Sequence, residues 1–171
     1  MSRALRALTV LALLHLFASQ SMAAVLAPTT AHELLDEVRG AGTTVVLIHL
    51  WATWCPPCRE EFPLVVELEH KYRDRGLKVL LVSADSVTGL DAVQEFLDRH
   101  GVDYPTFIKA QQDQAFIAGL GTDWRGELPA SFFFTADGTL RTWWPGPGDR
   151  ARFEEAIQPL LAGAKPNKGE E

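Results

Sequence analysis

A buried strand that runs directly into a helix carrying a pair of cysteines constrains this chain more than any other feature of its sequence. Residues 43–50 are rich in β-branched and other apolar side chains, which is typical of a strand covered on both faces of a sheet. Cys55 and Cys58 follow within a few residues, and from residue 57 to about 75 the apolar side chains recur at helical spacing. This order of elements predicts an α/β fold.

The alternation of strands and helices continues to the end of the chain. Thr30 and Glu33 form a capping-box pattern that opens a short helix. Further strands are predicted over residues 77–83, 104–109, 130–135 and 139–144, and further helices over residues 89–100, 112–120 and 149–162. With 171 residues, 47% of them apolar, the chain can bury one core. We therefore predict one domain, a sandwich with a mixed central sheet flanked by helices.

The first 23 residues have the layout of a signal peptide. Arg3 and Arg6 precede an apolar run over residues 7–18, and residues 21–23 offer small side chains for cleavage. A membrane-spanning helix needs about 20 apolar residues, and polar side chains interrupt this run earlier. We expect export to the periplasm or a similar compartment and a soluble protein after cleavage. An uncleaved N-terminal membrane anchor, with the domain facing the periplasm, is the alternative.

The remaining sequence divides into a domain over residues 24–164 and a short tail over residues 165–171, which is predicted to be disordered. The formal net charge of -6 comes from charges of both signs scattered along the chain, without a basic stripe. Such a chain is not expected to bind nucleic acid, because phosphates are bound by clustered lysine and arginine side chains. We expect a monomer.

The chain contains two cysteines, and their spacing indicates a redox-active pair rather than a disulfide that stabilises the fold. A bridge between Cys55 and Cys58 closes almost no chain and therefore stabilises the fold little. The helix N-terminus stabilises a thiolate through its unpaired amides and dipole, so we expect Cys55 to be the nucleophile and Cys58 to resolve the mixed disulfide. Pro56 and Pro57 lack amide protons and should tune the redox potential. No organic cofactor is needed, because the sulfur atoms themselves carry the electrons.

Metal binding is the alternative use of two such cysteines. A structural zinc site needs four ligands, but there is no second C-x-x-C, and His32, His49, His70 and His100 lie at no ligand-like spacing from one another. We predict no metal site. Transient binding of copper(I) between the two thiolates remains open.

The segment Leu-Trp-Ala-Thr-Trp-Cys-Pro-Pro-Cys-Arg-Glu-Glu-Phe-Pro, residues 50–63, resembles the TlpA/ResA-like (DsbE-like) branch of the thioredoxin superfamily. The resemblance extends from about residue 43 to residue 162. It implies a thioredoxin-like fold with an added helix and short strand between the second and third core strands, for which residues 89–109 are the candidates. It also implies an exported thiol-disulfide oxidoreductase that takes electrons from a membrane-bound donor and reduces client proteins, typically in cytochrome c or metal-centre assembly.

Two residue roles follow from the resemblance. Glu61 matches the acid of the branch and would exchange a proton with Cys58, although it could be a solvated helix carboxylate instead. Pro129 matches the cis-proline that lies against the cysteines and leaves nearby backbone free for substrate, although it could simply be a proline at the entry of a strand. Leu128, which precedes it, is a candidate substrate contact, as are Pro56 and Pro57 beside the cysteines.

Other positions depart from the pattern or flank the centre. His49 stands where the superfamily has a buried carboxylate or the branch an amide, so it either modulates proton traffic to Cys58 or is a satisfied core histidine. Trp54 is expected to contact substrate and to pack around the centre. Trp124 and Arg125 lie in a loop, residues 121–126, that either selects a partner or is plain surface.

The first functional hypothesis is therefore an enzyme that reduces client disulfides. The same residues also allow an oxidant that donates its disulfide, or a module that carries copper(I). The sequence does not fix the redox potential, so the direction of electron flow stays open at this point.

Overall fold

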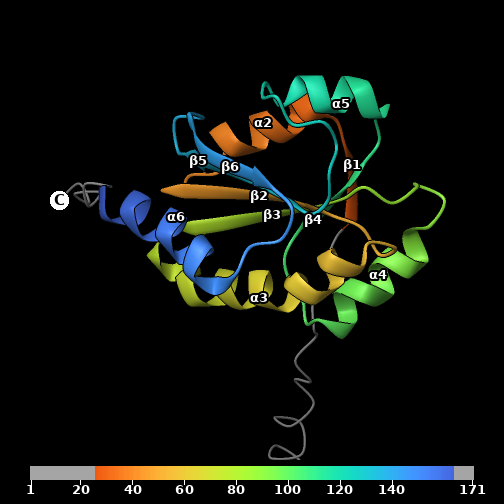
Figure 1. The fold of residues 1–171 in the computed structure, drawn as a ribbon, viewed down its shortest axis with the longest axis horizontal. Coiled ribbons are helices and arrows are strands. Elements are labelled where there is room, and N and C mark those ends of the chain that lie inside the picture. Colours follow the sequence, from red (N-terminus) through yellow and green to blue (C-terminus); the bar gives the residue numbers. More distant parts are fainter. Residues whose placement is uncertain (1–25, 164–171) are drawn as a thin grey trace, which may run out of the picture.

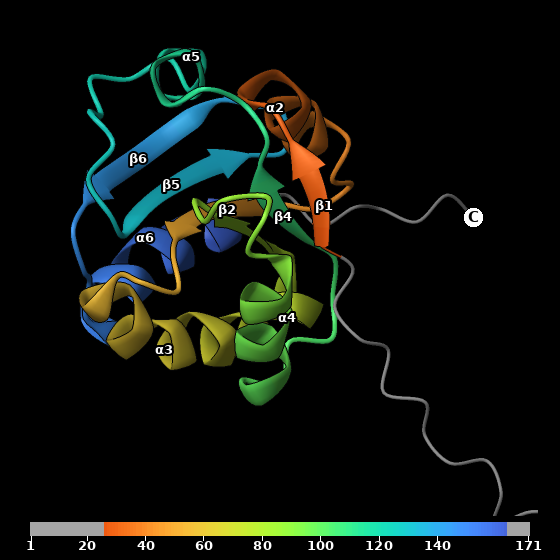
Figure 2. The same ribbon diagram turned by 90° about the vertical axis from the view of Figure 1, so that its right-hand side faces the viewer.

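The computed structural model describes residues 26–163, and both the predicted signal peptide, residues 1–23, and the predicted tail, residues 165–171, lie outside the described residues. A six-stranded sheet, in the order β1-β4-β3-β2-β5-β6, lies between two layers of helices. Figure 1 shows α2 and α5 over one face of the sheet and α3, α4 and α6 over the other, and the turned view of Figure 2 agrees. The predicted mixed α/β sandwich is confirmed.

After the first strand, the elements follow the order expected from the sequence. The strands are β1 (Leu26–Thr29), β2 (Val45–Trp51), β3 (Leu77–Ser83), β4 (Thr106–Lys109), β5 (Ala130–Thr135) and β6 (Leu140–Pro145). The helices are α2 (Ala31–Arg39), α3 (Pro56–Tyr72), α4 (Leu90–Arg99), α5 (Asp113–Gly119) and α6 (Arg150–Gly163). As the resemblance implies, α4 and β4 come between the core strands β3 and β5 in the order of the chain. Among residues 26–163, no helix is both long and apolar enough to cross a membrane.

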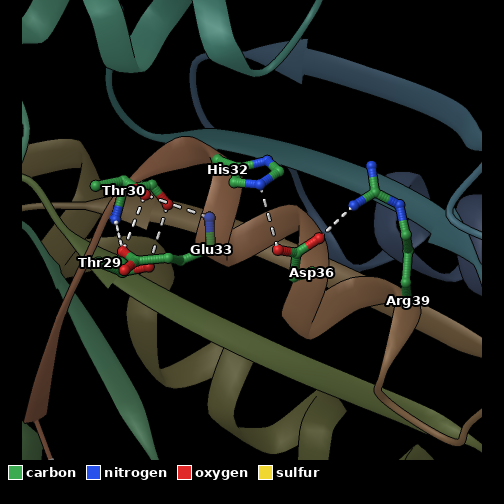
Figure 3. A network of polar contacts seen from close by, with 6 residues as sticks. All are labelled: Thr29, Thr30, His32, Glu33, Asp36 and Arg39. Atoms are coloured by element: carbon green, nitrogen blue, oxygen red, sulfur yellow. Dashed lines mark hydrogen bonds and ion pairs between the residues drawn. The ribbon is translucent and has the colours of Figure 1, made fainter.

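The first helix begins where its capping pattern predicts. Thr30 Oγ1 accepts a hydrogen bond from the Glu33 N–H at 3.3 Å, and Glu33 Oε2 accepts one from the Thr30 N–H at 2.8 Å (Figure 3). Farther along the exposed side of α2, Arg39 Nη1 donates to Asp36 Oδ1 at 2.5 Å. The two contacts between Thr30 and Glu33 satisfy free amides at the start of the helix and fix where it begins.

The edge strand β1 is not predicted from the sequence. It pairs in parallel with β4 and is four residues long, with Pro28 in its middle. A proline cannot donate to a ladder and is tolerated at a sheet edge, so local sequence argues against a strand here. The strand exists because β4, far away in the sequence, offers it a partner.

The central strand β2 contributes side chains to the core on both faces of the sheet. It pairs in parallel with β3 and antiparallel with β5, and all of its residues are buried. Leu47 and Trp51 face the core under α3, α4 and α6, whereas Ile48 and Leu50 face the core under α2 and α5. Since side chains alternate along a strand, His49 lies on the same face as Leu47 and Trp51. A titratable side chain therefore sits in the core beneath the cysteine helix.

Aromatic side chains join the added helix α4 to the cysteine helix α3. The Trp51 ring lies 4.6 Å from the Phe62 ring of α3 and 4.9 Å from the Phe96 ring of α4, between centroids. All three side chains are at most 5% exposed, so they bury a large apolar area directly below the start of α3. This packing holds the first turns of α3 in a fixed place.

Candidate active site

Cys55 is the N-cap residue of α3, as the sequence predicts. The structure holds it in a disulfide with Cys58, with an S–S distance of 1.99 Å. Pro56 and Pro57 occupy the first two helical positions and have no N–H, so the Cys58 N–H is the first-turn amide that reaches the Cys55 sulfur, at 3.3 Å. Cys55 is 4% exposed and Cys58 is fully buried. A sulfur atom of another protein can therefore approach the pair only at Cys55.

The turn that carries Cys55 is tied to the end of β3. The Asp85 carboxylate accepts hydrogen bonds from the Thr53 N–H at 2.9 Å and from the Thr53 hydroxyl at 2.5 Å. Ser83 Oγ also donates to Asp85, at 2.7 Å. Sequence reasoning missed Asp85, although the signal was present: β2 and β3 are parallel, so polar residues that follow both strands meet at one edge of the sheet.

Pro129 lies at the same edge. The Leu128–Pro129 peptide bond is cis, and the next residue, Ala130, pairs with Leu50 near the end of β2. The Pro129 carbonyl accepts a hydrogen bond from the Gly146 N–H at 2.8 Å. The register thus brings Pro129 next to the strand end from which the chain leads to Cys55.

Glu61 is not a solvated helix carboxylate, because its side chain is only 2% exposed. It lies one turn beyond Cys58 on α3, and its Oε2 accepts a hydrogen bond from the Gly148 N–H at 2.8 Å. A side chain at Gly148 would come within 3.1 Å of Phe153 and 3.2 Å of Trp144, so only glycine brings this amide so close without displacement. Burial raises the pKa of Glu61 to about 7, against the opposing effects of the Gly148 N–H and the charge of Arg152.

His49 is fully buried and faces Glu61. Its Nδ1 lies 3.1 Å from Ser131 Oγ and 3.8 Å from Glu61 Oε1, while its Nε2 has no hydrogen-bond partner. Burial lowers the pKa of His49 to about 3, so the ring is neutral at physiological pH. His49 is thus a core histidine, and it is also the group that faces the acid of α3.

Three predicted substrate contacts meet at one cavity. Trp54 is 65% exposed and forms one wall, and Trp124 and Leu128 form others. The cavity has a volume of about 270 Å³ and is lined by Leu50, Trp54, Ser83, Ala84, Lys109, Asp113, Phe116, Ile117, Trp124, Arg125, Gly126 and Leu128. Trp124 is buried and its Nε1 donates to the Glu127 carbonyl at 2.9 Å. Within the loop over residues 121–126, Trp124 is thus packed into the wall of the cavity, whereas Gly121, Asp123 and Arg125 are exposed.

Pro56 lies away from this cavity, in a shallow groove between the start of α3 and the end of α4. The groove is lined by Pro56, Arg59, Glu60, Phe96, Arg99 and His100. Four of the predicted contacts therefore divide between two concave surfaces, and Pro57 lines neither of them. Within residues 26–163, His, Cys, Asp and Glu side chains form no group of three or more that could hold a metal ion.

Comparison with known proteins agrees with this geometry. The family model described as AhpC/TSA family matches residues 28–143. A thiol-disulfide oxidoreductase ResA from Geobacillus kaustophilus is 32% identical over 139 residues, which cover 79% of this chain and 74% of the relative. A second ResA, from Bacillus thuringiensis, is 34% identical over 106 residues, which cover 62% of this chain and 56% of the relative. The chain thus spans little more than half the length of the Bacillus protein.

A solved structure gives the same picture of the fold. The crystal structure of a thiol:disulfide interchange protein of the thioredoxin family from Chlorobium tepidum has a TM-score of 0.60 and 25% sequence identity. The aligned part covers 74% of this chain and 83% of that one. With the family model matching more than half of its length, the chain belongs to the AhpC/TSA family of thioredoxin-fold proteins and is a relative of the ResA thiol-disulfide oxidoreductases.

Proposed function

We propose that this protein is a thiol-disulfide oxidoreductase that reduces disulfides in client proteins. The observation that carries the proposal is the cysteine pair at the N-terminus of α3, in which Cys55 alone can be approached and Cys58 is buried. The cis peptide bond before Pro129 and the buried Glu61, one turn beyond Cys58 on α3, support it. The names of the relatives point the same way.

The proposed reaction has two sulfur exchanges. In the reduced protein, the Cys55 thiolate attacks a client disulfide, which forms a mixed disulfide and releases one client thiolate. Glu61 then takes the proton of the Cys58 thiol, and the Cys58 thiolate attacks the Cys55 sulfur. The second client sulfur leaves as a thiolate, and the Cys55–Cys58 disulfide seen in the structure is formed. Two electrons pass to the client and no organic cofactor takes part.

The setting of the reaction is part of the proposal. Residues 1–23 have the pattern of a signal peptide or membrane anchor, which supports action in the periplasm or another exported compartment. Disulfide reduction in an oxidising compartment requires a dedicated supply of electrons. We therefore assign a membrane-bound electron donor and, following the resemblance, clients in cytochrome c or metal-centre assembly. The protein acts as a monomer in this proposal.

The direction of electron flow is tested by the reduction potential of the cysteine pair. Equilibration with glutathione or dithiothreitol buffers, followed by thiol trapping and mass spectrometry, should give a value near or below the roughly -270 mV of thioredoxin. A value near the about -120 mV of a strong periplasmic oxidant would reverse the assignment and make the protein a disulfide donor.

The cavity beside Trp54 is proposed to receive an apolar side chain next to the client cysteine. Trp54→Ala should lower the rate constant for reduction of a protein disulfide such as that of insulin about tenfold, because an exposed tryptophan at an interface contributes strongly to binding. Exchange with dithiothreitol, which is too small to use the cavity, should change little. The matched control is Val87→Ala, since Val87 is 49% exposed but does not line the cavity. Equal effects of the two variants on insulin reduction would contradict the proposed contact.

A further inference from the structure

The proposed role of Glu61 creates a buried negative charge that needs hydrogen-bond donors. A carboxylate in a core is costly unless its oxygens are bonded. Glu61 Oε2 accepts from the Gly148 N–H at 2.8 Å, but Glu61 Oε1 is buried and has no hydrogen-bond partner. When Glu61 gives up its proton, Oε1 therefore requires a donor from a side chain close by.

His49 is the side chain that faces this oxygen. Its Nδ1 is 3.8 Å from Glu61 Oε1, about 1 Å beyond a hydrogen bond. Its neighbours in the sheet are Leu81 on β3, which is apolar, and Ser131 on β5. From α6, the Phe153 ring lies 6.5 Å from the imidazole, between centroids.

The other polar groups around the acid come from the remaining elements. Arg152 of α6 acts on Glu61 through its charge and stacks on the Trp144 ring of β6, with 4.5 Å between its guanidinium carbon and the ring centroid. Trp144 Nε1 is buried without a hydrogen-bond partner. Cys58, on the same helix as Glu61, is the group with which the proton is exchanged.

The tautomer of His49 follows from its surroundings. The ring is neutral and carries one N–H, and its Nε2 is buried without a partner. A buried acceptor without a partner costs less than a buried donor without one, so the hydrogen belongs on Nδ1. Nδ1–H then donates to Ser131 Oγ at 3.1 Å. The ring therefore holds its one donor between two acceptors, the Ser131 hydroxyl and Glu61 Oε1.

We propose that His49 is a positioning residue whose Nδ1–H moves between these two acceptors as Glu61 changes its protonation state. While Glu61 is protonated, the N–H stays on Ser131. When Glu61 ionises, the N–H turns to Oε1 and stabilises the carboxylate that will take the proton of the Cys58 thiol. After that transfer Glu61 is neutral again and the donor returns to Ser131. This inference rests on the proposed function of Glu61.

Substitution of the His49 ring and substitution of its partner Ser131 should shift the pH profile in opposite directions. The measurement is single-turnover resolution of a mixed disulfide between Cys55 and a chromogenic aryl thiol, followed by thiolate release from pH 5 to pH 9. In the unsubstituted protein the rate should rise through an inflection near the Glu61 pKa of about 7. His49→Leu removes the donor and should move the inflection up by about one pH unit. Ser131→Ala removes the competing acceptor and should move it down.

Two further variants separate this inference from the function on which it rests. His49→Asn retains an N–H donor and should reverse most of the shift that His49→Leu causes. Glu61→Gln should remove the inflection altogether. If Glu61→Gln removes it while His49→Leu and Ser131→Ala leave it in place, His49 is a core residue only and the inference is wrong. If Glu61→Gln leaves the inflection unchanged, the proposed role of Glu61 fails instead. Should His49→Leu not fold, the downward shift in Ser131→Ala decides, because an unshifted profile there overturns the inference.

Discussion

Cys55→Ser is expected to abolish the reduction of client disulfides, leaving only the rate of the buffer thiols. A serine hydroxyl cannot form a disulfide, and the buried Cys58 cannot take over the attack. Cys58→Ser should behave differently: Cys55 still attacks, but nothing resolves the product, so one client molecule stays covalently attached. Intact-protein mass spectrometry of the two variants after mixing with a client disulfide should show the adduct only for Cys58→Ser.

The control for both cysteine variants is their stability. The bridge between Cys55 and Cys58 has a sequence separation of three, so its loss should remove little free energy of unfolding. Thermal unfolding followed by circular dichroism should therefore find both variants folded at the assay temperature. Wild-type turnover by Cys58→Ser would show that Cys58 does not resolve the mixed disulfide, and client adducts on Cys55→Ser would show that Cys58 can be reached.

Glu61→Gln and His49→Leu are expected to change the pH dependence of stability in opposite directions. The folded protein keeps a proton on Glu61 up to about pH 7, whereas the unfolded chain loses it near the ordinary glutamate pKa of 4.5. Between these values the Glu61 contribution to the free energy of unfolding falls by about 1.4 kcal/mol for each unit of rising pH. In the folded protein His49 stays neutral down to about pH 3, whereas in the unfolded chain it is protonated below about pH 6.5. The His49 contribution therefore rises with pH between these values, at the same slope.

The two contributions cancel where they overlap, between about pH 4.5 and pH 6.5. Urea unfolding at a series of pH values, with each variant compared with the unsubstituted protein, reveals them separately. Relative to that protein, the free energy of unfolding of Glu61→Gln should rise by about 3 kcal/mol between pH 4.5 and pH 7. His49→Leu should lose about 4 kcal/mol of relative stability between pH 3 and pH 6.5. Parallel curves for a variant and the unsubstituted protein would show that the substituted group titrates alike in the folded and unfolded states.

Features set by neighbouring residues, such as where a helix begins, can be predicted from the sequence. The burial and partners of a side chain cannot, where they depend on residues far away in the sequence. The helix at Thr30 and the strand-to-helix passage into Cys55 follow from capping and periodicity, and both are confirmed. The burial of Glu61 could not be read from α3 alone, because the residues that cover it arrive more than eighty positions later; its bond to Gly148 spans 87 residues. The contact between His49 and Ser131 spans 82 residues and depends on the register of β5 against β2.

The approach to the cysteine pair through Cys55 alone sets an order on turnover. In the proposed function, the electron donor and the client both form their mixed disulfide with the same sulfur, because Cys58 is fully buried. The two proteins cannot occupy the centre together, and no ternary complex lies on the pathway. Under the proposed function each partner therefore has to leave before the other binds, and turnover alternates between the two partners in a ping-pong order.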